Sequence, residues 1–73
     1  MGSDAIEIGV KIDLETEIRE MKFITGASVE DLLRRLELYP DAYLALREGV
    51  PIPLTKILEN GDRIRLIKIA SGG

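Results

Sequence analysis

The chain contains no cysteine and no histidine among its 73 residues. No disulfide can therefore form, and neither a thiolate nor an imidazole is present to bind a metal ion. The usual nucleophile–base pairs of covalent catalysis are missing as well, because they draw on these same two residue types. We therefore expect a protein that is not itself an enzyme, that uses no metal or cofactor, and that works in the cytoplasm.

The chain also lacks an excess of positive charge and any long apolar run. Ten Lys and Arg residues against 13 Asp and Glu residues give a net charge of -3, which argues against nucleic acid as a partner. No run approaches the ~20 apolar residues of a membrane-spanning helix, so we expect no membrane partner. No secretory signal is visible at the start, and residues 1–3 are compatible with a cloning remnant.

What the chain does have is the composition of one small globular domain. Hydrophobic residues make up 45% and charged residues 32% of it, a balance that separates it from disordered chains. A chain of this length buries only about 60% of the surface that its unfolded form exposes, so its core must be small. We expect the domain to cover residues 1–69 and a flexible tail to cover residues 70–73.

The first part of the chain has the pattern of a hairpin. Residues 6–12 alternate apolar and polar side chains in strict period two, which predicts a half-buried strand. After a short turn, residues 16–23 predict a second strand in which Met21 and Phe23 share one face. Ile18 falls on the opposite parity, so we expect a bulge or a partly exposed apolar residue there.

One helix is predicted, and it begins after Ser28. Ser28 can cap the helix, and the acidic Glu30 and Asp31 suit the positive end of the helix dipole. Proline disfavours helical geometry in the residue before it, so we expect Pro40 and its neighbours to end the helix. The apolar stripe of this helix follows the i, i+3, i+4, i+7 spacing at Val29, Leu32, Leu33 and Leu36.

The second half of the chain has the pattern of several short elements. We expect a strand at 43–47, a turn, a short strand at 50–53, a short helical turn at 54–58, and a last strand at 63–69. Pro51 and Pro53 cannot donate a ladder hydrogen bond, so the strand at 50–53 belongs at an edge. The last strand is the most apolar run, so we expect it at the centre of the sheet, parallel to the first strand.

This order of elements predicts the fold class. One helix with a single apolar stripe must cover one face of a sheet, because the stripe needs an apolar partner. The order strand, strand, helix, strand, short strand, strand predicts an α+β fold of the β-grasp type. Its mixed sheet has four to five strands, with one main helix packed across one face.

Four segments carry a likeness to a known family: residues 29–33, 47–53 and 60–64, and the final Gly72-Gly73. On these segments the chain resembles the ubiquitin-like proteins, above all their small prokaryotic and archaeal branch. That branch includes the small archaeal modifier proteins, the thiazole-pathway sulfur carrier and the small subunit of molybdopterin synthase. Residues 43–47 depart from the Val-Asn-Gly sequence that is common in the sulfur carriers, which leaves the subfamily open.

The resemblance implies a chemistry for the C-terminus. Gly73 carries the reactive carboxylate, and Gly72 needs no room for a side chain. A separate ATP-dependent activating enzyme adenylates the carboxylate. Sulfur then attacks to give a thiocarboxylate, or a lysine attacks to give an isopeptide bond. The other partners are accordingly target proteins or sulfur-acceptor biosynthetic enzymes. Two alternatives stay open: a non-conjugating β-grasp interaction module, and a stable small subunit of molybdopterin synthase.

A docking surface is expected beside the tail. The last strand alternates two sets of side chains, which are Ile64 with Leu66 and Arg65 with Ile67 and Ile69. If the first set faces the helix, the second set places apolar groups on the open face of the sheet, and such a patch often marks an interface. The neighbouring strand extends it through Leu44 and Leu46, or through Tyr43 and Ala45.

Four lysines are candidate acceptors of an isopeptide bond if chains of this protein form. For each of them, an ordinary solvated surface lysine is the simpler interpretation. The four are Lys11, Lys22, Lys56 and Lys68.

Overall fold

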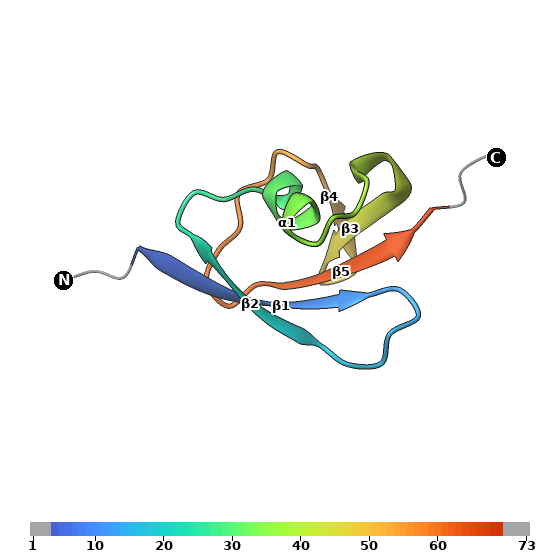
Figure 1. Cartoon of the computed structure of the whole chain (residues 1–73), viewed down its shortest axis with the longest axis horizontal. Helices are drawn as coiled ribbons and strands as arrows, with labels where there is room; N and C mark the ends of the chain where they lie inside the picture. The colour runs from blue at the N-terminus through green and yellow to red at the C-terminus, as the bar shows by residue number, and fades with distance from the viewer. Residues whose placement is uncertain (1–3, 70–73) are drawn as a thin grey trace.

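The computed structural model describes residues 4–69 of the chain. Its elements are β1 (Ala5–Ile12), β2 (Arg19–Ile24), α1 (Val29–Arg35), the 3₁₀ turn η1 (Pro40–Ala42), β3 (Tyr43–Arg47), β4 (Val50–Ile52) and β5 (Arg63–Lys68). In this part of the chain, five strands form one mixed sheet in the order β2-β1-β5-β3-β4. Figure 1 shows α1 lying across one face of the sheet, which leaves the other face open. The predicted α+β β-grasp architecture is confirmed.

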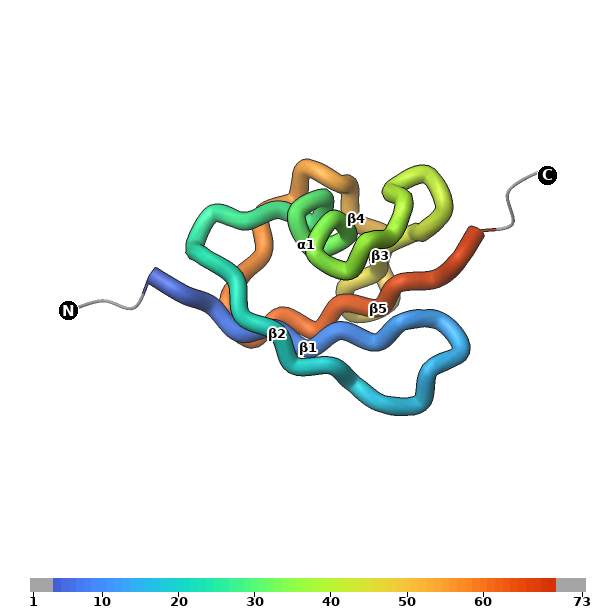
Figure 2. The backbone as a smooth tube through the Cα atoms, in the orientation of Figure 1, coloured from blue at the N-terminus to red at the C-terminus, as the bar shows by residue number. Residues whose placement is uncertain are grey.

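The central strand of the sheet is β5, as its apolar sequence predicted. It runs parallel to β1, with Gly9 opposite Arg63 and Ile12 opposite Leu66, and antiparallel to β3. Figure 2 shows the two parallel strands side by side, although they come from opposite ends of the chain. The crossover between the parallel strands includes α1, so the helix is held over the sheet by the connectivity itself.

The edges of the sheet are two hairpins. At one edge, β2 pairs with β1, and at the other edge the short β4 pairs with β3. Glu48 and Gly49 join β3 to β4 with φ values of 53° and 78°. Positive φ at both central residues is typical of the tight turn that matches the twist of a hairpin. The Pro-containing β4 lies at an edge, as expected.

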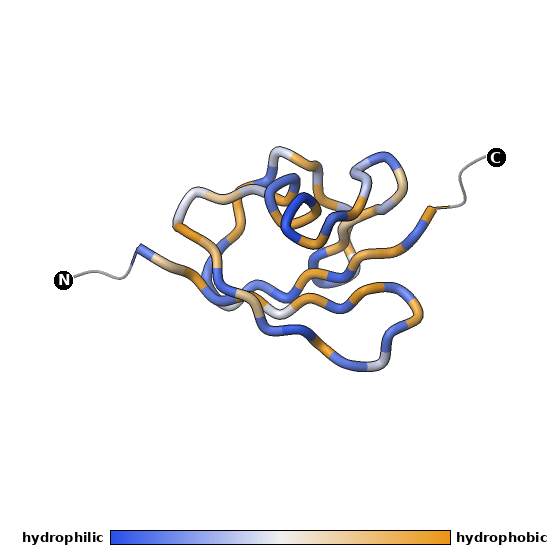
Figure 3. The backbone as a smooth tube through the Cα atoms, in the orientation of Figure 1, coloured by the Kyte–Doolittle hydropathy of each residue, from blue (hydrophilic) through white to orange (hydrophobic). Residues whose placement is uncertain are grey.

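The core lies between α1 and the sheet. Alternate residues of β1 and β5 face the helix, and Figure 3 shows the resulting alternation of apolar and polar residues along these strands. The apolar stripe of α1 meets them through Val29, Leu32 and Leu33. The largest fully buried side chains are Leu32, Leu33, Ile64, Leu66, Val10 and Val29. No helix in residues 4–69 is long and apolar enough to cross a membrane.

The start of α1 agrees with the sequence, but its end does not. Ser28 is the N-cap, and its Oγ accepts a hydrogen bond from the backbone N–H of Asp31 at 3.3 Å. The helix ends at Arg35, before the expected stop around Pro40. Glu37 takes a φ of 59°, and the N–H of Leu38 donates to the carbonyl of Leu33 at 2.9 Å. This C-terminal motif satisfies the last carbonyls and turns the chain away, so proline does not set the boundary.

The predicted helical turn at 54–58 is wrong. Leu54 and Lys56 instead use their carbonyls to accept from the N–H groups of Glu30 and Val29, at 3.0 and 2.9 Å. The first N–H groups of a helix have no partner within the helix. Segment 54–58 supplies those partners, and this tertiary pairing prevails over the weak local tendency to form a helical turn.

Several strand boundaries also differ from the expectations, and the clearest are these. β2 begins at Arg19 rather than at residue 16, β4 ends at Ile52, and β5 ends at Lys68. The residues before β2 form a connecting loop, in which Ile18 is 52% exposed. The expected partly exposed apolar residue is therefore present at Ile18, and it lies just outside the strand.

Candidate docking surface

The last strand divides its side chains between the two faces of the sheet. Ile64 and Leu66 are buried beneath α1, at 2% and 0% exposure. Arg65 is exposed and Ile67 is half-buried, and both alternate with the buried pair. Arg65 and Ile67 therefore lie on the open face. Ile69 follows the end of β5 and is 45% exposed.

The structure also decides between the two pairs of residues in β3. Ala45 is buried at 3%, whereas Leu44 is 39% exposed and Leu46 is half-buried. Leu44 pairs across the sheet with Ile67, and Leu46 pairs with Arg65. Side chains directly opposite one another on neighbouring strands lie on the same face. Leu44 and Leu46 therefore extend the open-face surface, and Tyr43 and Ala45 do not. We call this set the docking surface: Leu44, Leu46, Arg65, Ile67 and Ile69.

The expected tail, with Gly72 and Gly73, lies outside the described residues. What the structure does show is its point of attachment. The N–H of Ile69 donates to the carbonyl of Ala42 at 2.8 Å, which ties the chain to the start of β3. Four residues follow Ile69 in the sequence. At 3.3–3.6 Å per extended residue, they can span at most ~14 Å.

The four candidate acceptor lysines occupy four different environments. Lys11 is half-buried on β1, and Lys22 on β2 lies with its Nζ 3.6 Å from a carboxylate oxygen of Glu7. Lys56 is half-buried in the loop that pairs with α1, and Lys68 is exposed at the end of β5. They do not form one site, and their role as acceptors stays a prediction.

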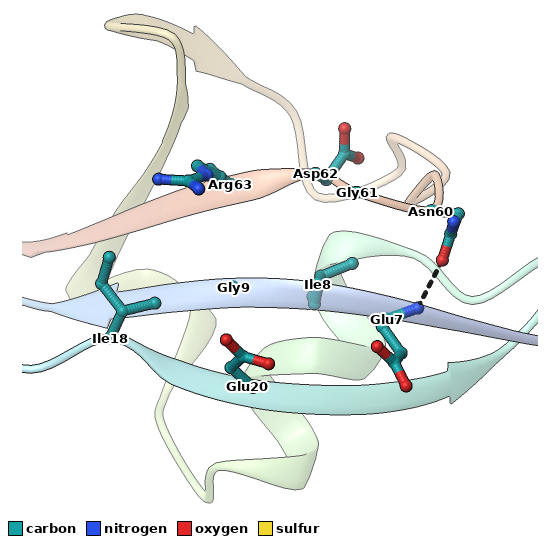
Figure 4. A pocket seen from close by; sticks show the side chains of 9 residues that line it. All are labelled: Glu7, Ile8, Gly9, Ile18, Glu20, Asn60, Gly61, Asp62 and Arg63. Atoms are coloured by element: carbon teal, nitrogen blue, oxygen red, sulfur yellow. Dashed lines mark hydrogen bonds between the residues drawn. The ribbon is translucent and has the colours of Figure 1, made fainter.

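A shallow cavity lies on the open face, and sequence reasoning did not find it. Its volume is about 290 Å³, and it is bounded by β1, the residue before β2 and the start of β5. Figure 4 shows Gly9 at its floor, with Ile18, Glu20 and Arg63 around it. A Cβ built on Gly9 would lie 3.1 Å from Cγ2 of Ile18. The signal in the sequence was the glycine that interrupts the polar side of an otherwise regular strand.

The rim of this cavity is fixed by the loop before β5. Oδ1 of Asn60 accepts from the backbone N–H of Glu7 at 2.8 Å, as the dashed line in Figure 4 marks. The N–H of Gly61 donates to the carbonyl of Glu7 at 2.8 Å, and the N–H of Gly9 donates to the carbonyl of Asp62 at 2.9 Å. These bonds hold the loop against β1, so the floor and the rim move together.

The electrostatics at the edge of the open face are simple. Glu15 hydrogen-bonds and attracts Arg19, which raises the pKa of the Arg19 guanidinium. Within residues 4–69, no group of three or more acidic side chains is placed to hold a metal ion.

Comparisons with known proteins agree with this geometry at the level of the fold. The sequence matches no protein-family model and no curated protein. Among solved structures, ubiquitin from Caldiarchaeum subterraneum superposes with a TM-score of 0.70 at 19% identity, covering 94% of this chain and 99% of that one. The chain has a ubiquitin-like fold.

Two further structures support the ubiquitin-like fold. Small archaeal modifier protein 1 from Haloferax volcanii has a TM-score of 0.72 at 20% identity, covering 89% of this chain and 99% of that chain. A de novo designed protein based on ubiquitin has a TM-score of 0.75 at 18% identity, covering 97% and 96%. Because both matches extend over almost the whole of each chain, the similarity concerns the complete β-grasp domain.

Proposed function

We propose that this chain is a ubiquitin-like protein modifier, a sulfur carrier, or both, whose reactive group is the carboxylate of Gly73. The observation that carries the proposal is the course of β5. This strand lies at the centre of a ubiquitin-like sheet and leads, one residue after its end, to the hydrogen bond that Ile69 donates to Ala42. Only four residues, ending in Gly72-Gly73, separate that bond from the carboxylate.

The proposed chemistry requires an activating enzyme. A carboxylate oxygen of Gly73 attacks the α-phosphate of ATP, pyrophosphate leaves, and an acyl-adenylate forms. A sulfur nucleophile or the amine of a target lysine then attacks the carbonyl carbon, and AMP leaves. In this scheme, the present chain supplies the acyl group and the docking surface, and all catalytic groups belong to the partner. The same proposal holds that the chain is not itself an enzyme and that it acts in the cytoplasm beside an ATP-dependent partner.

The docking surface supports this division of labour. Leu44 and Ile67 are neighbours across the β3–β5 pair on the open face. Ile69, which bonds to Ala42, follows Ile67 by two residues. An activating enzyme that covers this face is thereby close enough to receive the last four residues in a narrow channel. Glycine suits such a channel because no Cβ limits the approach of the backbone.

Deletion of Gly73 tests the proposal. We expect the shortened chain to fold as the full chain does, because the sheet, the helix and the core all lie within residues 4–69. We expect it to lose ATP–pyrophosphate exchange with the adenylating enzymes of its source cells. The matched control is Ser71→Ala, which keeps both glycines and should keep the exchange. Normal exchange by the shortened chain would refute the proposal.

Intact mass spectrometry of the protein from native cells separates the two forms of the function. A species with one oxygen replaced by sulfur indicates a carrier. Diglycine remnants on the lysines of other proteins after digestion indicate a modifier. A native chain that continues beyond Gly73 without processing would contradict both.

A further inference from the structure

Three cations on the open face have no acidic partner among the described residues. The ion pairs in this part of the chain involve Arg19, Lys22, Arg34 and Arg47. None of them involves Lys11, Arg63 or Arg65. Among the described residues Lys56 and Lys68 also make no ion pair. What distinguishes Lys11, Arg63 and Arg65 is that they lie together on one face of the sheet.

The three cations are brought together by the parallel pairing of β1 and β5. Arg63 lies opposite Gly9, and Arg65 lies opposite Lys11. All three cationic residues have the parity of the open face, since the intervening Val10 and Ile64 are buried. Because Gly9 has no side chain, Ile18 can lie close to it: a Cβ at Gly9 would be 3.1 Å from Cγ2 of Ile18.

A second cavity, of about 170 Å³, lies at this position. The residues that matter here are Gly9, Lys11, Ile18, Leu46, Arg63 and Arg65, and we call them the basic groove. Gly9, Ile18 and Arg63 also line the larger cavity described above, so the two cavities adjoin one another. Ile18 and Leu46 provide aliphatic walls, and the Leu46 wall is shared with the docking surface.

We propose that the basic groove binds an acidic segment of the partner protein, in which carboxylates alternate with branched aliphatic side chains. The carboxylates contact Lys11, Arg63 and Arg65, and an aliphatic side chain packs between Ile18 and Leu46. This inference rests on the proposed function, because it gives the chemistry of the surface by which the activating enzyme recognises the chain.

The surroundings of the groove favour an acidic protein over a nucleic acid. Glu48 lines the smaller cavity, and Glu7 and Glu20 line the larger one, so a continuous phosphate backbone would meet negative charge on both sides. Nucleic-acid sites of this kind also use aromatic side chains on which bases stack. No aromatic residue lines either of these two cavities. A short segment with well-placed carboxylates fits where a polyanion does not.

The test uses the full chain, labelled with ¹⁵N, and a synthetic peptide. The probe is acetyl-Asp-Leu-Asp-Ile-Asp-amide, and its control is the same peptide with asparagine in place of aspartate. We expect the acidic probe to shift the amide signals of the groove residues and the neutral control to leave them. Since the contact is electrostatic, binding should weaken at least threefold between about 0.05 and 0.5 M salt.

Charge-removing variants locate the contact. We expect Lys11→Gln and Arg63→Gln each to weaken the binding of the acidic probe about threefold, the scale of a solvent-exposed ion pair. Lys22→Gln is the matched control, because Lys22 is exposed on the neighbouring strand and already lies 3.6 Å from Glu7. It should leave probe binding unchanged. Amide spectra of each variant confirm that the fold is kept.

Four results would overturn the inference. They are equal binding of the neutral peptide, shifts that lie outside the groove, an equal loss in Lys22→Gln, and tighter binding of a single-stranded oligonucleotide than of the acidic probe. The measurement involves neither ATP nor Gly73. A failure here therefore leaves the proposed chemistry of the C-terminus intact, and a failure of the Gly73 deletion test leaves this result interpretable.

Discussion

Two leucines on neighbouring strands show how position in the sheet decides the role of a residue. Leu66 on β5 is fully buried beneath α1, whereas Leu44 on β3 is 39% exposed on the open face. Complete burial of a leucine side chain contributes about 1.5–3 kcal/mol, and partial burial contributes correspondingly less. The sequence pattern separated Ile64 and Leu66 from the alternate residues of β5, but it did not decide which set faces the helix, and it left the parity of Leu44 open as well. Each face of β3 carries two apolar or aromatic residues, Leu44 and Leu46 on one and Tyr43 and Ala45 on the other. Alternation alone therefore could not decide which of the two faces is buried.

Truncation of each leucine measures this difference. We expect Leu66→Ala to lower the free energy of unfolding by about 2–5 kcal/mol, because it leaves a cavity in the core. Leu44→Ala should lower it by less than about 1 kcal/mol, since water already reaches that side chain. Urea unfolding of the two variants provides the comparison. Equal losses in the two variants would mean that the open face is covered in the free protein.

At the scale of the element, α1 is a short helix that depends on its ends. Ser28 and Asp31 form a reciprocal cap, in which the backbone N–H of Ser28 donates to Oδ2 of Asp31 at 2.8 Å. The serine and the acidic first turn made this start predictable, because a cap depends on residues within one turn. The end of the helix was missed because Glu37 carries no strong local signal. Glycine is the residue usually found at such a position, with its positive φ.

The cap makes part of the stability dependent on pH. The hydrogen bonds from the backbone and the hydroxyl of Ser28 lower the pKa of Asp31. The contribution of Asp31 is therefore present above the ordinary aspartate pKa of about 3.9, and it is lost as the pH falls through the lowered value. We expect Asp31→Asn to be less stable than the parent at pH 7, with the difference shrinking below about pH 4.

Urea unfolding at a series of pH values checks this prediction. The relevant quantity is the difference in unfolding free energy between the parent and Asp31→Asn, because the other carboxylates titrate in both proteins. Asp41→Asn serves as the control, since Asp41 is exposed in η1 and makes no helix cap. A parent–variant difference that stays constant down to the most acidic pH would contradict the assignment.

At the scale of the whole molecule, the sheet separates a structural face from a binding face. One face carries α1 (Figure 1) and the core, and the other carries the docking surface and the basic groove. Exposed apolar groups cost stability in a small protein, so a patch kept on one face points to a partner that covers it. The net charge of -3 does not reveal that Lys11, Arg63 and Arg65 lie together on the open face.

A charge placed in the docking surface tests the role of the binding face. We expect Leu44→Asp to raise the KM of the activating enzyme for this chain about tenfold, the loss typical of an interface residue worth just over 1 kcal/mol. The kcat should change little, because the C-terminal residues are intact. Tyr39→Asp is the control, since Tyr39 is 80% exposed in the loop between α1 and η1, away from this surface. Equal effects of the two substitutions would contradict the placement of the interface.

The sequence by itself determined the elements with strong local or periodic signals. The alternation in β1 and β5, the cap at Ser28 and the two prolines at the edge together predict the β-grasp order that the structure has. These signals are local because hydrogen-bond geometry and side-chain period act within a few residues. The docking residues of β5 could be proposed in the same way, since one face of a half-buried strand must be open.

Only the tertiary structure decided which distant residues meet. Segment 54–58 does not form a helical turn, because two of its carbonyls accept hydrogen bonds from the first N–H groups of α1. Gly9 and Arg63 form one groove because β1 and β5 pair in parallel in one particular register. Such pairings depend on how the whole chain buries its apolar surface, and no window of the sequence contains both partners. The fold could therefore be predicted from local patterns, whereas the groove depends on contacts between residues far apart in the chain.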